Sequence, residues 1–142
     1  MQPFYSDAWF LRIGEIFNSV ARECQFPITA FSLVEIMSDG PVDATGLLPG
    51  IRFELRDGAV TLTRGVDAAL TADVEILSRW ADAAVSARQP KGPERQRFQA
   101  HRIAMGHLVV KGDLSPVSEL FDKAHDLIVE VTGTPREAPT TS

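Results

Sequence analysis

The sequence has one cysteine, few basic residues and no long apolar run, and each shortage excludes a class of protein. Cys24 alone cannot form an internal disulfide or a thiolate metal site. The 14 Lys and Arg residues are outnumbered by 19 Asp and Glu residues, and the net charge of −5 argues against nucleic acid as the main partner. No apolar run reaches transmembrane length and the amino terminus lacks the basic start of a secretion signal, so we expect a cytoplasmic protein without an integral membrane segment.

Catalytic motifs are also scarce. His101, His107 and His125 have no metal-ligand spacing, and the sequence contains neither a GxSxG nucleophile elbow nor a glycine-rich phosphate loop. Cys24 lies at the end of a predicted helix with no base beside it in the sequence. We therefore predict no catalytic residue, no metal and no cofactor.

The length and apolar content of the chain are typical of one compact domain. With 142 residues, 44% of them apolar, the chain can bury a core of its own. We expect a single domain over residues 1–132. The tail 133–142 has two prolines and three threonines and is predicted to be disordered.

Apolar periodicity predicts helices and strands along the chain. A helix is expected from its cap, Asp7, to about residue 23, because apolar side chains recur on one stripe. Strands are expected at 28–37, at 72–76 and at 107–111, the last with Leu108 and Val110 facing inward. The clearest signal is a hairpin in which Ile51–Leu55 and Val60–Leu62 alternate on either side of an Asp57-Gly58 turn.

Three more helices complete the order of elements. We predict one capped by Ser78, one over 94–104, and one that begins at Ser115-Pro116, whose apolar face runs to Val131. Asp113 is expected to cap the turn before the last helix. The order predicts an α+β fold, a mostly antiparallel five-stranded sheet with helices covering one face.

Four motifs, which follow one another along the chain in the same order as in the family, resemble the sterol carrier protein type 2 family over residues 8–128. The most specific is Met105–Asp113, which is similar to the family's Gly-x-apolar-x-apolar-x-Gly-Asp motif. The other three are Asp39-Gly40-Pro41 after the first strand, Asp57-Gly58 in the hairpin, and Ala72–Ile76 running into a helix. The resemblance implies a sheet and helices that enclose a tunnel for lipids. The chain departs from the family pattern in a longer charged insertion at 88–102.

Three alternative functions are open. The first is the binding or carriage of an apolar ligand, such as a fatty acid, a fatty acyl-CoA, a sterol or a similar lipid, on behalf of a partner enzyme. The second is a small enzyme or enzyme subunit that orients an apolar substrate in the same cavity, with His101, Asp113 or His125 facing it. The third is a pocketless dimerisation or scaffold module. The oligomeric state is left open.

Candidate cavity residues are the large apolar side chains of the predicted helices and of the turn before the last strand. The alternative for each is ordinary core packing, because aromatic residues at helical spacing usually pack. An interior lined only by carbon favours a carrier, whereas a buried carboxylate or imidazole with a shifted pKa favours catalysis. The candidates are Trp9, Phe10, Ile13, Phe17, Trp80, Phe98, Met105, Leu120 and Phe121.

The insertion at 88–102 carries five of the fourteen basic residues of an acidic chain. Within it, Arg95, Arg97 and Arg102 are candidates for binding an anionic head group, a carboxylate or the phosphates of an acyl-CoA, at the mouth of a cavity. The alternative is a solvated helix face.

Overall fold

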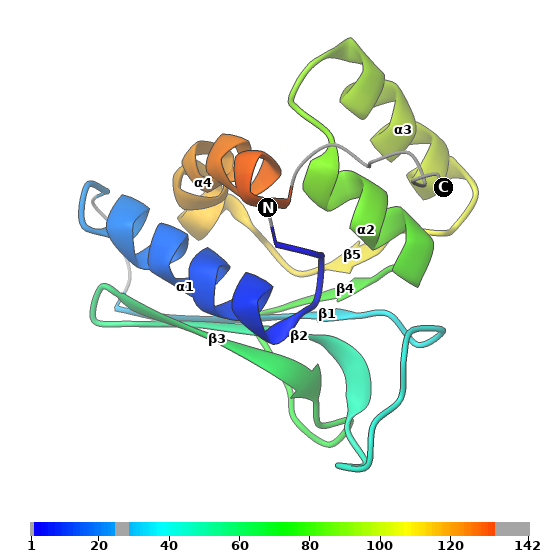
Figure 1. The fold of residues 1–142 in the computed structure, drawn as a ribbon, viewed down its shortest axis with the longest axis horizontal. Helices are drawn as coiled ribbons and strands as arrows, with labels where there is room; N and C mark the ends of the chain where they lie inside the picture. The colour runs from blue at the N-terminus through cyan, green and yellow to red at the C-terminus, as the bar shows by residue number, and fades with distance from the viewer. Residues whose placement is uncertain (1, 25–28, 133–142) are drawn as a thin grey trace.

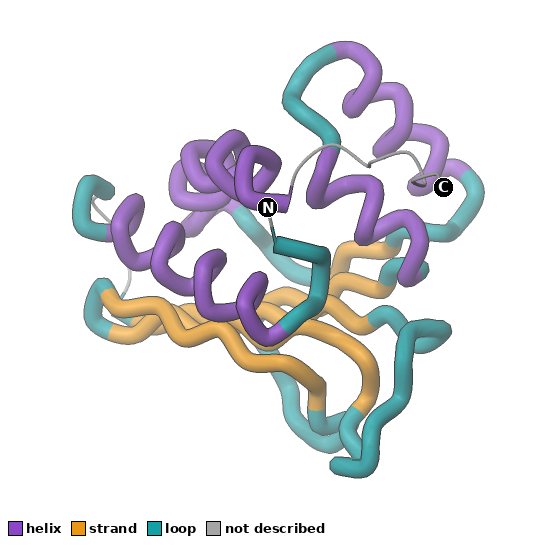
Figure 2. Tube along the Cα trace, viewed as in Figure 1, coloured by secondary structure: helices purple, strands orange, loops and turns teal. Residues whose placement is uncertain are grey.

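A computed structural model describes residues 2–24 and 29–132. Its helices are α1 (Asp7–Ala21), α2 (Trp80–Arg88), α3 (Pro93–Ala104) and α4 (Ser118–Thr132), and a short 3₁₀ turn, η1 (Ser115–Val117), precedes α4. Its strands are β1 (Ala30–Ile36), β2 (Leu48–Arg56), β3 (Ala59–Val66), β4 (Val74–Leu77) and β5 (Val109–Lys111). All of these helices lie on the same face of the sheet (Figures 1 and 2).

The strands form one open sheet in the order β3-β2-β1-β4-β5. β1 and β4 are parallel, and the other neighbouring pairs are antiparallel. The predicted α+β fold is therefore confirmed. The predicted hairpin is also confirmed: Leu55 pairs with Val60, and both Asp57 and Gly58 have positive φ, as a tight turn between twisted strands requires.

The core lies between the sheet and the helices. Leu62, Phe53, Leu33 and Val74 are neighbours across four strands and form a continuous apolar row under α1 and α4. From α4, Leu120 is fully buried against this layer. Burial of each such side chain stabilises the fold by about 1.5–3 kcal/mol.

The first and last described residues are held together. The backbone N–H of Gln2 donates to the carbonyl of Val131 at 2.8 Å, and the indole N–H of Trp9 donates to the hydroxyl of Thr132 at 2.9 Å. Helix α1 is thus fixed to the end of α4, and both cover the same part of the sheet.

The predicted cap of α2 was wrong. The backbone N–H of Trp80, the first residue of the helix, donates to the carboxylate of Asp39 at 2.9 Å, from the turn after β1. Ser78 instead accepts a hydrogen bond from Arg102. A cap from a residue distant in the sequence leaves no local pattern to read.

Two other helix starts also differ from prediction. Ser6, rather than Asp7, accepts the N–H of Trp9 at the start of α1. Ser115 lies inside η1 and is not the cap of α4, although Asp113 accepts its N–H, as expected for that turn.

The edge strand β5 is shorter than predicted and covers only Val109–Lys111. Val110 is on the predicted inward side but is 45% exposed, because β5 pairs with β4 alone. The start of the predicted first strand at residue 28 and the predicted tail at 133–142 lie outside the described residues. Within the part that is described, no helix combines the length and apolar character needed to span a membrane.

We predict that Leu120→Ala lowers the free energy of unfolding by about 2–5 kcal/mol, because it leaves a cavity in a fully buried layer. Leu127→Ala on the same helix is the control, since Leu127 is 40% exposed and the change should have only a small effect. Urea unfolding of both variants measures the difference. Equal losses would contradict this account of the core.

Candidate binding site

A cavity of about 160 Å³ lies between the sheet and helices α1, α2 and α4. Leu33, Ile51 and Phe53 from the strands form its floor. Helices α1, α2 and α4 contribute most of its remaining wall through Trp9, Ile13, Phe17, Ala83, Ala87, Phe121 and Ile128. The two alanines of α2 are small, which leaves space beside this helix.

Three polar side chains interrupt this apolar wall: Glu35, Ser86 and His125. Glu35 is in the inward row of the sheet, paired with Ile51 on β2 and Ile76 on β4. Burial raises the pKa of its carboxyl group, and this effect is opposed by the nearby guanidinium of Arg102 and by a hydrogen bond with Ser78. The cavity therefore has an acidic group on its floor.

His125 lines the same cavity from another element, α4. Its Nε2 lies 2.8 Å from the carbonyl oxygen of Gln89, so Nε2 carries a proton and donates. Burial lowers the pKa of His125, and the hydrogen bond to Gln89 only partly offsets this. The imidazole is therefore mainly neutral at neutral pH.

A second hollow, which we call the mouth, adjoins the cavity and has a volume of about 330 Å³. The two spaces share Phe121, His125 and Ile128. The mouth adds Lys91 and Arg95, together with Leu114, Ser118 and Asp122. The apolar cavity and this partly charged surface hollow are therefore neighbours that meet at three residues of α4.

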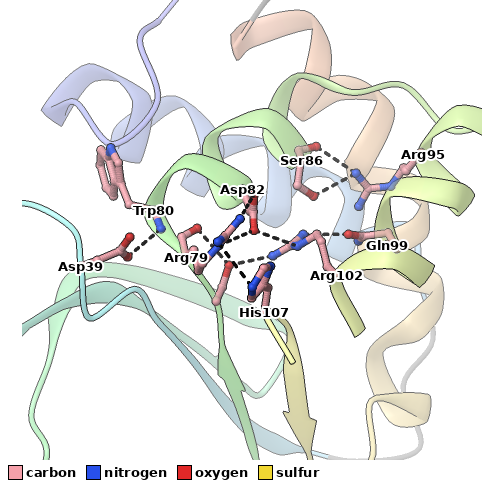
Figure 3. Close-up of polar contacts among 10 residues, drawn as sticks. Asp39, Arg79, Trp80, Asp82, Ser86, Arg95, Gln99, Arg102 and His107 are labelled. Carbon is pink, nitrogen blue, oxygen red and sulfur yellow. Dashed lines mark hydrogen bonds and ion pairs between the residues drawn. The ribbon is translucent and has the colours of Figure 1, made fainter. Parts of the chain in front are cut away.

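Arg95 is held by α2. Its Nη1 donates to both the carbonyl oxygen and the hydroxyl of Ser86, each at 2.9 Å (Figure 3). Burial, and then repulsion from Arg102, lower the pKa of Arg95. Arg95 forms no ion pair with a carboxylate of residues 2–24 and 29–132, whereas Lys91 contacts Asp122 at 3.3 Å and Asp126 at 3.5 Å.

Arg102 is the buried residue of α3, with 3% of its surface exposed. Its guanidinium donates to the side chains of Ser78 and Gln99, each at 2.7 Å. Its Nε lies 3.9 Å from the carboxylate of Asp82, which Arg79 also contacts at 3.0 Å (Figure 3). These contacts attach α3 to α2 and to the end of β4.

Four predicted cavity residues line the cavity: Trp9, Ile13, Phe17 and Phe121. Leu120 is fully buried in the core beside it. Met105 ends α3 and is 57% exposed. Whether any of these side chains binds a ligand stays a prediction.

The other three predicted aromatic residues pack elsewhere. Phe10 contacts the rings of Tyr5 and Trp9 and lies under the guanidinium of Arg64. Trp80 packs edge-on against Tyr5, with ring centroids 4.9 Å apart. Phe98 stacks under Arg102, with the guanidinium 5.3 Å from the ring centroid.

The three predicted head-group arginines are separated by the fold. Arg95 lies at the mouth, Arg97 is exposed beside the α2–α3 connection, and Arg102 is buried. Of the polar residues proposed for an enzyme, His125 lines the cavity, while His101 and Asp113 are exposed.

Glu35 and Ser86 were missed by the sequence analysis. Phe31, Leu33 and Met37 alternate, and this period of two places Glu35 on the same inward face. Val34, which is also buried, obscured the pattern. Ser86 gave no signal, because its role depends on Arg95 from a later helix.

Comparisons with known proteins identify the fold. A scan against protein-family models and a search of curated proteins found no match. The chain is similar to a crystal structure of sterol carrier protein 2, with a TM-score of 0.57 and 18% identity over 89% of this chain and 98% of that one. This likeness shows that the chain has the SCP2-like fold, as the sequence resemblance predicted.

Two further solved structures are similar at lower scores. One is the UbiJ-SCP2 ubiquinone synthesis protein, with a TM-score of 0.48 and 16% identity over 84% of this chain and 94% of that one. The other is a conserved protein from Thermus thermophilus, described as possibly a sterol carrier protein, with a TM-score of 0.45 and 16% identity over 98% of this chain and 96% of that one.

The raised pKa of Glu35 predicts a pH-dependent effect of Glu35→Gln. The folded state binds the carboxyl proton more tightly than the unfolded state does. The contribution of protonated Glu35 to the free energy of unfolding is therefore fully present at low pH, and it is lost as pH rises through the raised pKa. Glu35→Gln should therefore gain stability relative to the natural protein as pH rises above about 4.3, the ordinary pKa of a glutamate. Urea unfolding at each pH measures this gain. Glu75→Gln, on the opposite face of β4, is the control, and an equal gain there would refute the assignment.

We also predict that Arg102→Met lowers the free energy of unfolding by about 3–5 kcal/mol, because it removes the cation beside Asp82 and Glu35. Arg97→Met, at an exposed position of the same helix, should have little effect. Adding Glu35→Gln to Arg102→Met should recover part of the loss. Strict additivity of the two changes in thermal or urea unfolding would show that the two groups are not coupled.

Proposed function

We propose that the protein binds an amphipathic lipid-like molecule, a fatty acid or fatty acyl derivative. Its apolar portion occupies the cavity, and its acidic group lies in the mouth beside Arg95 and Lys91. The observation that carries this proposal is that the apolar cavity and a surface hollow containing Arg95 share the lining residues Phe121, His125 and Ile128. The names of the similar structures, which include sterol carrier protein 2, agree with a role in lipid binding.

The size of the cavity limits the ligand. An engineered protein cavity of about 150 Å³ holds one benzene ring, so a cavity of about 160 Å³ suits a short acyl segment or a single ring. Ligand pockets usually measure about 300–1,000 Å³; the cavity alone is smaller than this, and the mouth, at about 330 Å³, brings the combined space within that range. A medium-length acyl chain with its head group in the mouth fits both spaces, whereas a sterol requires the helices to move.

The charges at the mouth favour an acidic head group. Lys91 is already paired with two aspartates, while Arg95 donates only to the neutral Ser86 among the described residues. A partly buried guanidinium without a carboxylate partner is stabilised by an anion, and its planar donors suit a carboxylate or phosphate. Arg95 is therefore the proposed head-group ligand.

This arrangement suits a carrier that holds its ligand for a partner enzyme. A second candidate function, a small enzyme or subunit acting on the same ligand, is favoured by one observation: Glu35 and His125 both line the cavity and both have shifted pKa values. Incubation of the protein with a bound acyl ligand, followed by mass spectrometry, separates the two. A carrier returns the ligand unchanged.

We predict that Arg95→Gln weakens the binding of octanoate by about tenfold or more, because a charge-assisted hydrogen bond is lost. Binding of 1-octanol, which has no charge, should change little. Isothermal titration calorimetry at low and high salt measures both ligands, and the salt dependence for octanoate should decrease in the variant.

Arg97→Gln is the matched control, because Arg97 is exposed on the same helix and does not line the mouth. Ala87→Phe should abolish the binding of both ligands by filling the cavity. The proposal fails if the natural protein binds neither ligand, or if Arg97→Gln and Arg95→Gln have equal effects.

A further inference from the structure

Glu35 occupies a position where the sheet otherwise presents hydrocarbon. Across the strands its neighbours are Ile51 and Ile76, and Ile76 is in turn paired with Val110. The chain turns Glu35 inward because Leu33 and Met37, two residues to either side, are buried against the helices. An acidic side chain here is costly to the fold unless it has a partner.

The groups around Glu35 come from several elements, and most are already engaged. Arg102 on α3 directs its donors to Ser78 and Gln99 and lies 3.9 Å from Asp82. The hydroxyl of Ser78 forms the hydrogen bond with Glu35, accepts from Arg102 and also lies 3.3 Å from the carbonyl of Arg79. The protein therefore compensates the charge of Glu35 only in part.

Two neutral polar side chains line the cavity together with Glu35. His125 on α4 and Ser86 on α2 also line the space, and each has another partner: Gln89 for His125 and Arg95 for Ser86. Apart from these, the wall is hydrocarbon. Glu35 is thus the acidic group of the described residues that a molecule in the cavity meets.

We propose that Glu35 binds an oxygen atom on the apolar portion of the ligand, so that the ligand is an oxygenated acyl chain, a hydroxy or keto acid. This inference rests on the proposed function and adds to it a second polar contact at the floor of the cavity. A carboxyl group donates its proton to a carbonyl or hydroxyl oxygen, and it accepts from a hydroxyl in either protonation state. A plain hydrocarbon chain offers neither, so it adds no hydrogen bond to the carboxyl on the cavity side.

The electrostatics of the site agree with this role. Burial raises the pKa of Glu35, which favours the protonated form that donates a hydrogen bond. The charged group that acts on it is Arg102, from α3, whose guanidinium also lies beside Asp82. His125, from α4, is mainly neutral and does not favour the ionised carboxylate.

The test compares octanoate with a set of hydroxyoctanoates that carry the hydroxyl at different carbons. We expect at least one isomer to bind the natural protein about tenfold more tightly than octanoate by titration calorimetry. Glu35→Leu should abolish this preference and bind octanoate at least as tightly as the natural protein does. Glu35→Gln, whose amide both donates and accepts, should keep part of the preference.

The controls separate this inference from the proposed function. Glu75→Leu changes the same residue type on the neighbouring strand, on the face away from the helices, and should leave the preference unchanged. If the natural protein binds octanoate but no hydroxyoctanoate isomer more tightly, or if the preference survives in Glu35→Leu, the proposed role of Glu35 is wrong and the proposed function still stands. If the natural protein binds none of these acids, the proposed function fails as well. Thermal unfolding of each variant confirms that it is folded.

Discussion

The buried guanidinium of Arg102 is the interaction on which the arrangement around the cavity depends. A charge with 3% of its surface exposed is tolerated only with hydrogen-bond partners and opposite charge, and three elements supply them: the end of β4, helix α2 and α3 itself. Glu35 on β1 in turn relies on the same cation for partial compensation. The position of α3 and the presence of an acid on the cavity floor therefore constrain each other.

This constraint explains how a helix with little apolar character is attached to the domain. Arg102 is the buried residue of α3, so the helix is held by polar contacts rather than by an apolar stripe. Arg95 adds a second attachment, through Ser86. Because such contacts are directional, they orient α3 and the connection before it more narrowly than apolar packing does, and Arg95 is held at the mouth of the cavity.

The fold was predictable from local patterns, and the site only in part. Alternation around Asp57-Gly58 and the apolar stripes of α1 and α4 are periodic signals within single elements, so the hairpin, the sheet class and four cavity-lining residues followed from them. Asp39 capping α2, Arg102 entering the interior and Glu35 facing a cavity each depend on residues far apart in the sequence. Arginine in particular looks the same in a sequence whether it contacts solvent, a ligand or a buried carboxylate.

The contact between Gln2 and Val131 has a consequence for how this fold is used. Because the backbone at Gln2 and at Val131 lies side by side, a short linker can join these two positions. New termini can then be opened at an exposed turn such as Asp57-Gly58 without distorting the core. The same geometry lets the domain be inserted into a loop of a host protein, since entry and exit are neighbours.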